Sequence, residues 1–493
     1  MSVKNIEQLI SGNNIYQANI ERWKFLYNSF IGGQTYRDAA YLTRYQNETA
    51  DEYKARLNNT PLDNHCASII QVYNSFLFRS EPERDYGSMT NLPELNDFIK
   101  DADFEGRDIT AFMKEVSTWS NVFGHSFILV SKPNIGALTR ADEIVNQVRP
   151  YVSLLTPMTV LDWTWERQIN GRYELVYFKY VEDLNGDTQT IKEWYPELIK
   201  TTSVNTIDDM ILSEEVEVNQ LGQIPVIICY AQRSIIRGIG SSSISDVADT
   251  QRFIYNALSE ADQSIRLDSH PSLVTTPDAN VGTGAGAIIT ISETSDPGLK
   301  PYVLDFAGAN IQSIYTVIDK AVASIDKMSN VGGVRSTLTQ SMSGVALQTE
   351  FQLLNARLSQ MASNLSLAEE QLWRLFCLYQ NQPYDVSISY PESFEIRDTE
   401  NEIQQLQTAK SAATDPRILA AIDIKILDWL SLDSDEFIAM LHPTVNDMDL
   451  LEQEEGYYKP KMLINPQTLE TKQVMSYEEE QALALEGWVE KED

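Results

Sequence analysis

Hydrophobic and aromatic residues recur every three to four positions over long stretches of the chain, a spacing that predicts amphipathic helices. Six segments show it most clearly, at residues 16–30, 63–78, 109–122, 243–267, 309–328 and 345–379. The glycine pair Gly32-Gly33 follows the first segment and is expected to end that helix, because glycine favours helix termini. The chain is therefore expected to be mainly helical.

Short runs of β-branched and aromatic residues predict strands between these helices. Residues 125–133 contain a short apolar strand closed by proline, and residues 150–230 alternate or run apolar. Asn170-Gly171 and Asn185-Gly186 are hairpin turn signals, so we expect a largely antiparallel sheet there. A Gly/Pro/Ser-rich stretch farther on contains one expected strand, at 287–291. The predicted fold class is α+β, mainly helical.

The length of 493 residues favours several structural units, and a hydrophobic fraction of 43% is enough for a sizeable core. No apolar run approaches the length of a membrane-spanning helix, and the N-terminus lacks the apolar core of a signal peptide. We therefore expect a protein that is made and kept in a cytoplasm, without membrane contact. The cysteines Cys66, Cys229 and Cys377 form no CxxC pair and are expected to be buried free thiols.

The net charge of −33 is unusual, with 71 Asp and Glu against 38 Lys and Arg. Residues 393–493 alone contain 23 acidic and 8 basic residues, which leaves −15. Such a chain is not expected to wrap nucleic acid, because phosphate binding depends on Lys and Arg. An acidic surface suits a wall along which DNA slides without sticking, and it also serves plain solubility.

Recognisable catalytic motifs are missing from the sequence. It has no GK dipeptide and hence no P-loop, and it has no HExxH or GxSxG. The histidines His65, His125, His270 and His442 stand alone, so helix-end or core roles are expected rather than metal ligation. Neither an enzymatic activity nor a cofactor is expected. A metal-dependent nucleic-acid enzyme stays an alternative, because spacing alone does not exclude paired carboxylates as metal ligands.

Two glycine- or aspartate-rich patterns have simpler explanations than a ligand site. The sequence GTGAGA follows a Pro-rich turn and precedes a strand, so a flexible loop is favoured over a dinucleotide site. Asp183, Asn185 and Asp187 hint at a calcium loop, but no Glu stands at the twelfth position. A hairpin turn explains these three residues better.

Four stretches carry further local features, at residues 45–82, 104–130, 222–266 and 342–360. In the third, a strand marked by proline leads to Gly240-Ser241 and to an Asp-rich helix start with Asn256 in its middle. The fourth opens the longest helix with Ser343-Gly344 and Ala346-Leu347. Together with the order helix, β excursion, helix, Gly/Ser/Thr loop and long helix, these stretches resemble the portal proteins of tailed bacteriophages.

The resemblance implies a division of the chain into portal segments. These are a wing (1–242), a first stem helix (243–267), a clip (268–305), a second stem helix (306–328), a tunnel loop (329–344), a long wing helix and strand (345–397) and an acidic helical crown (398–493). Subunits of this family form a ring, here expected to have 12 copies, at one capsid vertex. The implied location is the virion, after assembly in the bacterial host cytoplasm.

The resemblance also implies candidate functional residues. The tunnel loop would contact passing DNA through Asn330, Gly332, Gly333, Arg335, Ser336, Thr337, Thr339, Gln340 and Ser341. Charges of the stem that are candidates for the channel wall are Glu260, Asp262, Asp319, Lys320, Asp326 and Lys327. The clip would dock partners through Asp278, Asn280, Gly282, Gly284 and Gly286. Arg335 is expected to repeat around the ring as a positive belt; a flexible linker is the alternative.

The partners implied are further copies of the chain and double-stranded DNA, bound without sequence preference. The terminase large subunit, a head-to-tail adaptor, and the major capsid and scaffolding proteins complete the implied set. A different structural protein of a phage head or tail is the principal alternative, since it would share the acidity and the missing motifs.

Overall fold

The computed structural model forms two compact units, residues 1–395 and 396–493. In the first unit it describes residues 6–134, 140–208, 210–269, 272–274, 280–281, 289–290, 302–304, 309–335, 344–391 and 393–394; in the second it describes 408–411, 419, 422, 461–464, 471–474, 483 and 489–490. Helices and strands both occur, which confirms the α+β class. Within these residues, no helix is both long and apolar enough to cross a membrane.

The N-terminal part of the first unit is helical, as the spacing predicted. Its elements are α1 (Ile6–Ile10), α2 (Asn14–Ile31), α3 (Gly33–Asp38), α4 (Ala50–Asn59), α5 (His65–Leu77), the 3-10 turn η1 (Gly87–Asn91), α6 (Pro93–Lys100) and α7 (Ile109–Phe123). The Asn13 side chain caps α2 by accepting from the Tyr16 amide at 2.7 Å. Gly32 ends α2 with a φ of +67°, where glycine is favoured.

A three-stranded antiparallel sheet forms the centre of this unit. Strand β2 (His125–Ser131) lies between β3 (Tyr151–Leu155) and β9 (Val226–Tyr230), and all of its residues are buried. Helix α7 enters β2 through Gly124, whose φ is +94°. There the backbone of Gly240 approaches so closely that a Cβ on either glycine would overlap the other's backbone. The two glycines therefore fix where the chain passes from β9 to the next helix.

A five-stranded antiparallel sheet contains the other predicted strands, in the order β4 (Val160–Arg167), β5 (Tyr173–Asn185), β6 (Thr188–Trp194), β7 (Leu198–Asn205) and β8 (Met210–Val218). The two predicted turns connect β4 to β5 and β5 to β6, so both hairpins are confirmed. Asp183, Asn185 and Asp187 belong to the second hairpin. The short helix α8 (Arg140–Val145) lies between β2 and β3 along the chain.

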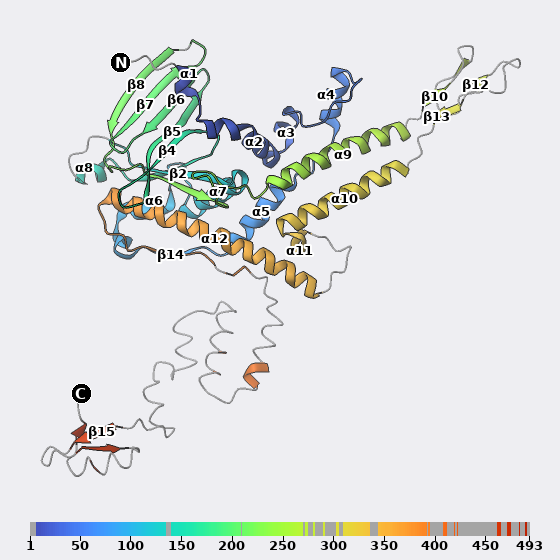
Figure 1. Cartoon of the computed structure of the whole chain (residues 1–493). Helices are drawn as coiled ribbons and strands as arrows, with labels where there is room; N and C mark the ends of the chain where they lie inside the picture. The colour runs from blue at the N-terminus through green and yellow to red at the C-terminus, as the bar shows by residue number, and fades with distance from the viewer. Residues whose placement is uncertain are drawn as a thin grey trace. The chain divides into compact units, whose positions relative to one another are not determined.

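Four helices follow: α9 (Ser245–Ser269), α10 (Ala309–Ser329), the single turn α11 (Gly332–Arg335) and α12 (Gly344–Gln380). The three long ones match the predicted helices to within a few residues. Helices α9 and α10 pack side by side and project from the body of the unit (Figure 1). Between them along the chain, β10 (Ser272–Val274) pairs with β13 (Tyr302–Leu304), and β11 (Asn280–Val281) pairs with β12 (Ile289–Thr290). The strand expected at 287–291 is thus present as β12.

Helix α12 is held in the body by a buried charged network. Arg84 in β1 (Glu83–Asp85) pairs with Glu369 at 2.6 Å, and their side chains are 8% and 0% exposed. Tyr390, just past β14 (Ser387–Ser389), donates its hydroxyl to Glu369, as does the indole of Trp373. Buried charges are stable only when paired and hydrogen-bonded in this way. The network fixes α12 against the β1–β14 ladder.

The second unit corrects one prediction. We expected residues 398–493 to be helical. Residues 408–411 are helical, but β15 (Lys461–Ile464), β16 (Thr471–Val474) and β17 (Val489–Glu490) form one antiparallel sheet. Leu463 is buried in β15. Acidic composition does not distinguish helix from strand, and runs of four residues are too short to show a period.

The three cysteines are free and buried, as predicted. Burial raises the pKa of Cys66 to about 12 and those of Cys229 and Cys377 to about 11. They are therefore protonated thiols at neutral pH and poor nucleophiles.

Candidate functional site: the α9–α10 helix pair and its root

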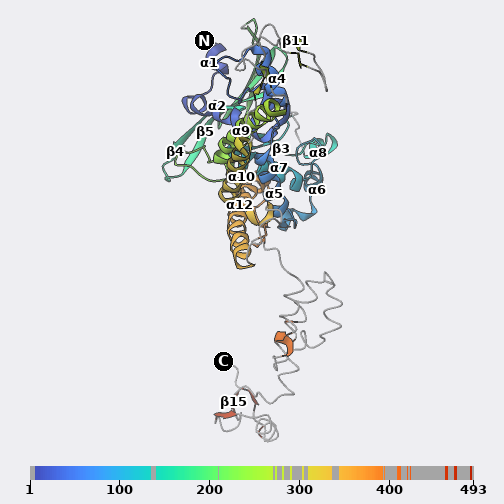
Figure 2. The same ribbon diagram turned by 90° about the vertical axis from the view of Figure 1, so that its right-hand side faces the viewer.

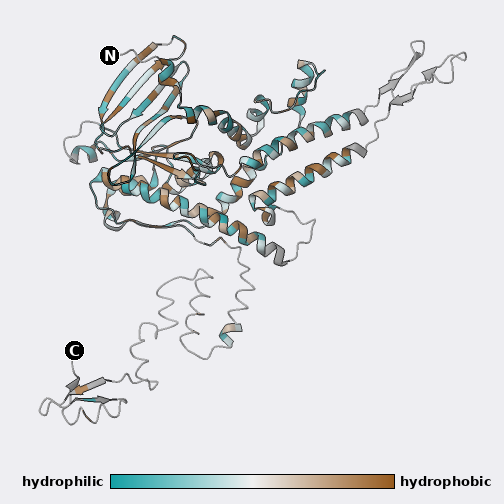
Figure 3. Ribbon diagram, in the orientation of Figure 1, coloured by the Kyte–Doolittle hydropathy of each residue, from teal (hydrophilic) through white to brown (hydrophobic). Residues whose placement is uncertain are grey.

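The apolar stripes of α9 and α10 change character along their length. Near the body, Ile254 of α9 and Ile325 of α10 are buried. Farther out, Ile265 and Tyr315 are each 39% exposed, and Ile311 is half-buried. Hydrophobic residues recur along both helices (Figure 3). The pair thus has a root anchored in the core and leaves apolar surface open along its length, including Phe253 beside Ile254.

Charged and polar contacts hold the root of α9. Arg22 of α2 pairs with Asp249 at 2.7 Å and also donates to Ser245 at the helix start. The hydrogen bond from Arg22 lowers the pKa of the Asp249 carboxyl. The buried amide of Gln251 accepts from the Cys66 backbone and donates to the Ser29 carbonyl. These contacts connect α9 to both α2 and α5.

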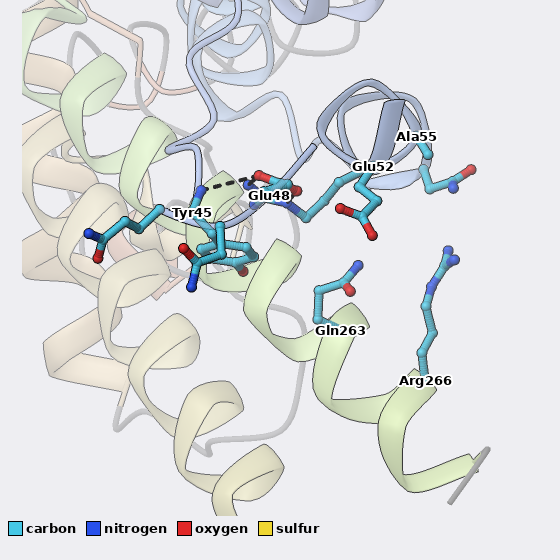
Figure 4. Close-up of a pocket in the computed structure, with 10 residues that line it drawn as sticks. Tyr45, Glu48, Glu52, Ala55, Gln263 and Arg266 are labelled. Carbon is cyan, nitrogen blue, oxygen red and sulfur yellow. Dashed lines mark hydrogen bonds and ion pairs between the residues drawn. The ribbon is translucent and has the colours of Figure 1, made fainter. Parts of the chain in front are cut away.

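Beside α4, a polar groove of about 540 Å³ borders α9 (Figure 4). Arg56 pairs with Glu48 at 2.8 Å under nearly complete burial, and its guanidinium lies over the Tyr45 ring, 4.0 Å from the centroid. Tyr45 donates its hydroxyl to Glu260 of α9 at 2.7 Å. Partial burial and the Glu260 carboxylate raise the pKa of Tyr45 to about 12. Glu260, one of the predicted channel charges, is therefore already engaged within its own subunit.

The root of α10 is fixed by two residues that the sequence did not single out. Tyr73 of α5 donates its hydroxyl to the Ser329 carbonyl at 2.6 Å. Arg357 of α12 donates to the Met328 carbonyl at 3.2 Å and to the Ser243 carbonyl at 3.3 Å, with its guanidinium over the Tyr73 ring. A cation at the C-terminus of α10 complements the helix dipole. Arg357 thus joins the end of α10 to the segment that enters α9.

Arg335, the residue of the expected positive belt, forms an ion pair within the chain. Arg335 lies at the end of α11 and pairs with Asp326 of α10 at 2.8 Å, and both side chains are only 16% exposed. It also contacts Nδ1 of His65 at 2.7 Å. Because guanidinium can only donate, His65 must accept and is neutral in this contact. A belt made by Arg335 alone would therefore be neutralised by Asp326.

Gly332 and Gly333, two of the candidate tunnel-loop residues, begin the helical turn α11. A Cβ on Gly332 would lie 2.7 Å from Oε2 of Glu350 in α12, which is the end of a flexible side chain that can move aside. The chain reverses at Asn330 instead, which has a φ of +56°.

Three of the candidate channel charges are exposed on α10: Asp319, Lys320 and Lys327. None of them has an ion-pair partner among the described residues. Asp262 pairs with Arg266 one turn on, at 2.9 Å. Lys320 and Lys327 are seven residues apart and so share one face of the helix.

Several candidate residues lie outside the described part of the chain. These are Ser336, Thr337, Thr339, Gln340 and Ser341 of the proposed tunnel loop, and Asp278, Gly282, Gly284 and Gly286 of the proposed clip. His270 and His442 also lie outside it. Asn280 begins β11, opposite Thr290.

Of the other histidines, His65 begins α5 and His125 begins β2. His125 is fully buried, which lowers its pKa to about 3, and its Nδ1 accepts from the Gly240 amide at 3.3 Å. Both fit the expected helix-end and core roles. Within the described residues, no group of three or more His, Cys, Asp and Glu is arranged to hold a metal ion.

No protein-family model matches the chain, and no curated protein matches it. Among solved structures, it is similar to a chain from the neck of an empty GTA particle computed with C6 symmetry, with a TM-score of 0.42 and 10% identity over 78% of this chain and 95% of that chain. A chain from the virion of a native gene transfer agent (GTA) particle has a TM-score of 0.41 and 10% identity, over 79% of this chain and 99% of that chain. A chain from the neck of a native GTA particle computed with C12 symmetry has a TM-score of 0.39 and 10% identity, over 84% of this chain and 98% of that chain. All three TM-scores are below 0.5.

Proposed function

We propose that this chain is a portal subunit, which closes into a ring of about twelve copies around a channel for double-stranded DNA. Helices α9 and α10 form the stem in this proposal, and the segment from Ser329 to Gly344 forms the tunnel loop. The β-ladders between the two helices form the clip, and the second unit forms the crown. The chain has no reaction of its own, and a separate motor supplies the energy of packaging.

The observation that carries the proposal is the exposed apolar surface of the α9–α10 pair. Phe253 is 51% exposed, Val317 45%, and Ile265 and Tyr315 39% each. A two-helix layer that projects from its domain cannot cover these side chains by itself. Neighbouring pairs in a ring would cover them, and removing half of each side chain from water contributes on the order of 1 kcal/mol per residue. Every contact in the ring would repeat that gain.

The charges of α10 suit the inner wall of such a channel. Asp319 and Lys320 are adjacent, and Asp326 and Lys327 repeat the pair seven residues on, on the same helix face. Since Arg335 neutralises Asp326, Lys327 stands as an exposed cation near the root. A wall of mixed sign in an acidic protein neither binds phosphate tightly nor repels it strongly. DNA would slide along it without sequence preference.

The partners follow from the same proposal. The clip (268–305) would dock the terminase large subunit during packaging and a head-to-tail adaptor afterwards. The body would contact the major capsid and scaffolding proteins at one vertex of the virion. Deleting Gly282 to Gly286 should abolish docking of the motor and leave rings intact; rings that still stimulated the motor would count against the clip assignment.

The ring is tested by placing a charge on the exposed helix surface. Tyr315→Asp combined with Phe253→Asp should remove rings from negative-stain images while circular dichroism shows a folded chain. Ile207→Asp is the matched control, because Ile207 is 70% exposed but lies at the turn between β7 and β8. Wild-type chains that never form rings with a central hole would refute the proposed function. Rings formed equally well by the double variant would refute the role of the helix pair.

A further inference from the structure

The connection from β9 to α9 presents an unusual surface, which we call the Arg–Ile loop (residues 231–240). Ile235 is fully exposed at 105%, Ile236 is 51% exposed, and Arg233 and Arg237 flank them. Neither arginine has a carboxylate partner among the described residues, in a chain with a net charge of −33. Two cations and two large apolar side chains are thus left open to solvent together.

This loop is held in shape by its own hydrogen bonds. The Ser234 amide donates to the Ile239 carbonyl at 3.3 Å, and the Ile239 amide donates to the Ile236 carbonyl at 3.2 Å. The Ile236 amide donates to the Ser234 hydroxyl at 3.0 Å. At the base, the Ser241 amide donates to the Gln232 carbonyl at 2.8 Å. The isoleucines are exposed by an ordered turn, and ordering them in a contact would cost little entropy.

Aromatic rings orient the two guanidinium groups. Arg237 lies over the Tyr173 ring at 4.0 Å and near the Trp165 ring at 5.7 Å, and Arg233 lies over the Tyr230 ring at 5.2 Å. Stacking of this kind occupies the face of a guanidinium and leaves the N–H donors at its edge available for carboxylates. The loop is therefore a preformed receptor for an acidic surface with an apolar centre.

A surface of that chemistry occurs elsewhere on the same chain. The α6–α8 groove has a volume of about 410 Å³ and is lined by Glu94, Asp97, Asp101 and Glu143, with Lys100 and Arg149 as its only cations among the described residues. Arg149 is buried, pairs with Asp101 at 3.3 Å and lies over the Phe104 ring at 4.2 Å. The charge of Arg149 is therefore neutralised by Asp101. Asp97 is exposed and has no ion-pair partner in the described residues.

Apolar side chains complete the match between the two surfaces. Phe104 lines the groove and is 48% exposed, and Val145 at the end of α8 is 81% exposed. The groove carboxylates come from both sides, from α6 and the residue after it and from α8. Glu143 pairs with Lys132 at 2.7 Å and Asp101 with Arg149 at 3.3 Å, so Asp97 is the carboxylate on which the match with the arginines mainly depends.

The two surfaces lie on opposite sides of the body. Strand β4, which supplies Trp165 beneath Arg237, is at one side in Figure 2, and α6 and α8 are at the other. Surfaces that are complementary but separated on one molecule cannot satisfy each other within a subunit. Two copies could satisfy them in a head-to-tail contact, and such contacts close into rings when the rotation allows.

We propose that the Arg–Ile loop of one copy docks in the α6–α8 groove of the next copy, with Arg233 and Arg237 paired to groove carboxylates and Ile235 and Ile236 packed near Phe104 and Val145. This inference rests on the proposed ring and names the surfaces of its subunit contact. The helix pair and this contact would then act at two different heights of the same interface.

Cross-linking between engineered cysteines tests the contact. A full-length chain carrying Ile235→Cys and Val145→Cys, treated with a short thiol-reactive cross-linker, should give a ladder of covalent multiples on a denaturing gel. The native cysteines are buried and serve as an internal background. Each single variant should give no ladder, because a head-to-tail contact brings residue 235 of one copy to residue 145 of another.

The possible outcomes distinguish failure of the proposed docking contact from failure of the proposed ring. Dimers from Ile235→Cys alone would overturn the proposal in favour of a two-fold contact of the loop. Rings in the microscope without any ladder would overturn the proposed surfaces and leave the portal function standing. Wild-type chains that form no rings would instead refute the function on which the proposal rests.

A charge exchange provides the second measurement. Arg237→Glu should weaken assembly at least about tenfold in the concentration at which rings form, because it places like charges together. Adding Asp97→Arg to the same chain should recover most of that loss. Arg79→Glu, at an exposed arginine outside both surfaces, is the matched control. If Arg237→Glu assembles normally but retains less DNA, the loop binds phosphate and the proposal is wrong.

Discussion

The junction of Arg335, Asp326 and His65 gives a prediction about the segment that enters the proposed channel. Replacing Arg335 with Gln removes the ion pair to Asp326 and the hydrogen bond to His65. It leaves a partly buried carboxylate whose pKa is already raised by burial, against the lowering effect of Arg335. The turn α11 and the end of α10 should therefore open more often.

The size of the effect lies between two known limits. Exposed ion pairs contribute about 0–1 kcal/mol, and breaking a fully buried pair costs about 3–5 kcal/mol. With both side chains 16% exposed, we expect a loss of about 2 kcal/mol, or roughly 30-fold in the opening equilibrium. Hydrogen exchange measured by mass spectrometry on a peptide spanning 326–335 reports this directly. Arg335→Lys keeps the charge without the planar fork and should fall between the variant and wild type.

A double-mutant cycle with Asp326→Asn decides whether the ion pair is responsible. If it is, the double variant should exchange only slightly faster than either single variant, because the interaction is lost once. Exchange that changes less than twofold in Arg335→Gln would refute the reasoning. It would mean that packing alone holds the turn.

The same junction should respond to pH. Burial, followed by the charge of Arg335, lowers the pKa of His65, while Asp63 acts in the opposite direction. A base whose folded pKa lies below its unfolded value of about 6.5 loses stability as the pH falls below 6.5. Exchange of the 326–335 peptide, corrected for its intrinsic rate, should accelerate between pH 7.5 and 5. His65→Asn retains an acceptor for Arg335 and should remove this acceleration.

Three further predictions concern the body of the chain. Glu369→Ala leaves the buried Arg84 without its partner and should lower the free energy of unfolding by about 3–5 kcal/mol, measured as a lower thermal unfolding midpoint. Adding Arg84→Met to the same chain should recover part of that loss. No recovery would argue against the ion pair as the cause. Gly240→Ala should cost about 3 kcal/mol or more, because its Cβ would overlap Gly124; an unchanged midpoint would contradict that approach. Because the pKa of His125 is about 3 in the folded chain, the free energy of unfolding should fall by about 2 kcal/mol as the pH is lowered from 7.5 to 5. His125→Asn should flatten this pH dependence of the unfolding midpoint.

The sequence alone was sufficient for elements whose pattern is long or whose turn chemistry is specific. Helix α12 repeats its stripe over 37 residues, and the Asn-Gly turns at 170 and 185 both join adjacent strands. The sequence did not reveal β15, β16 and β17 of the second unit, because strands of two to four residues are too short to show a period. Local pattern therefore predicts secondary structure in proportion to the length over which it repeats.

The root of the helix pair could not be predicted, because its contacts join residues far apart in sequence. His65 and Arg335 are separated by 270 positions, and Tyr73 and Ser329 by 256. Nothing in one sequence indicates that Arg357, on the polar side of a long helix, caps the end of α10. A resemblance to portal proteins places the tunnel loop after the second stem helix. It does not show that Arg335, the only cation of that loop, is already paired.

The central claim is that this chain assembles into a closed ring, and the mass of the purified full-length protein tests it most directly. A ring of twelve chains of 55.9 kDa has a mass of about 670 kDa, measured by native mass spectrometry or mass photometry. We predict a single dominant species at or near this mass, with a central hole in negative-stain images. A species that stays at 55.9 kDa at the highest attainable concentration would contradict the account.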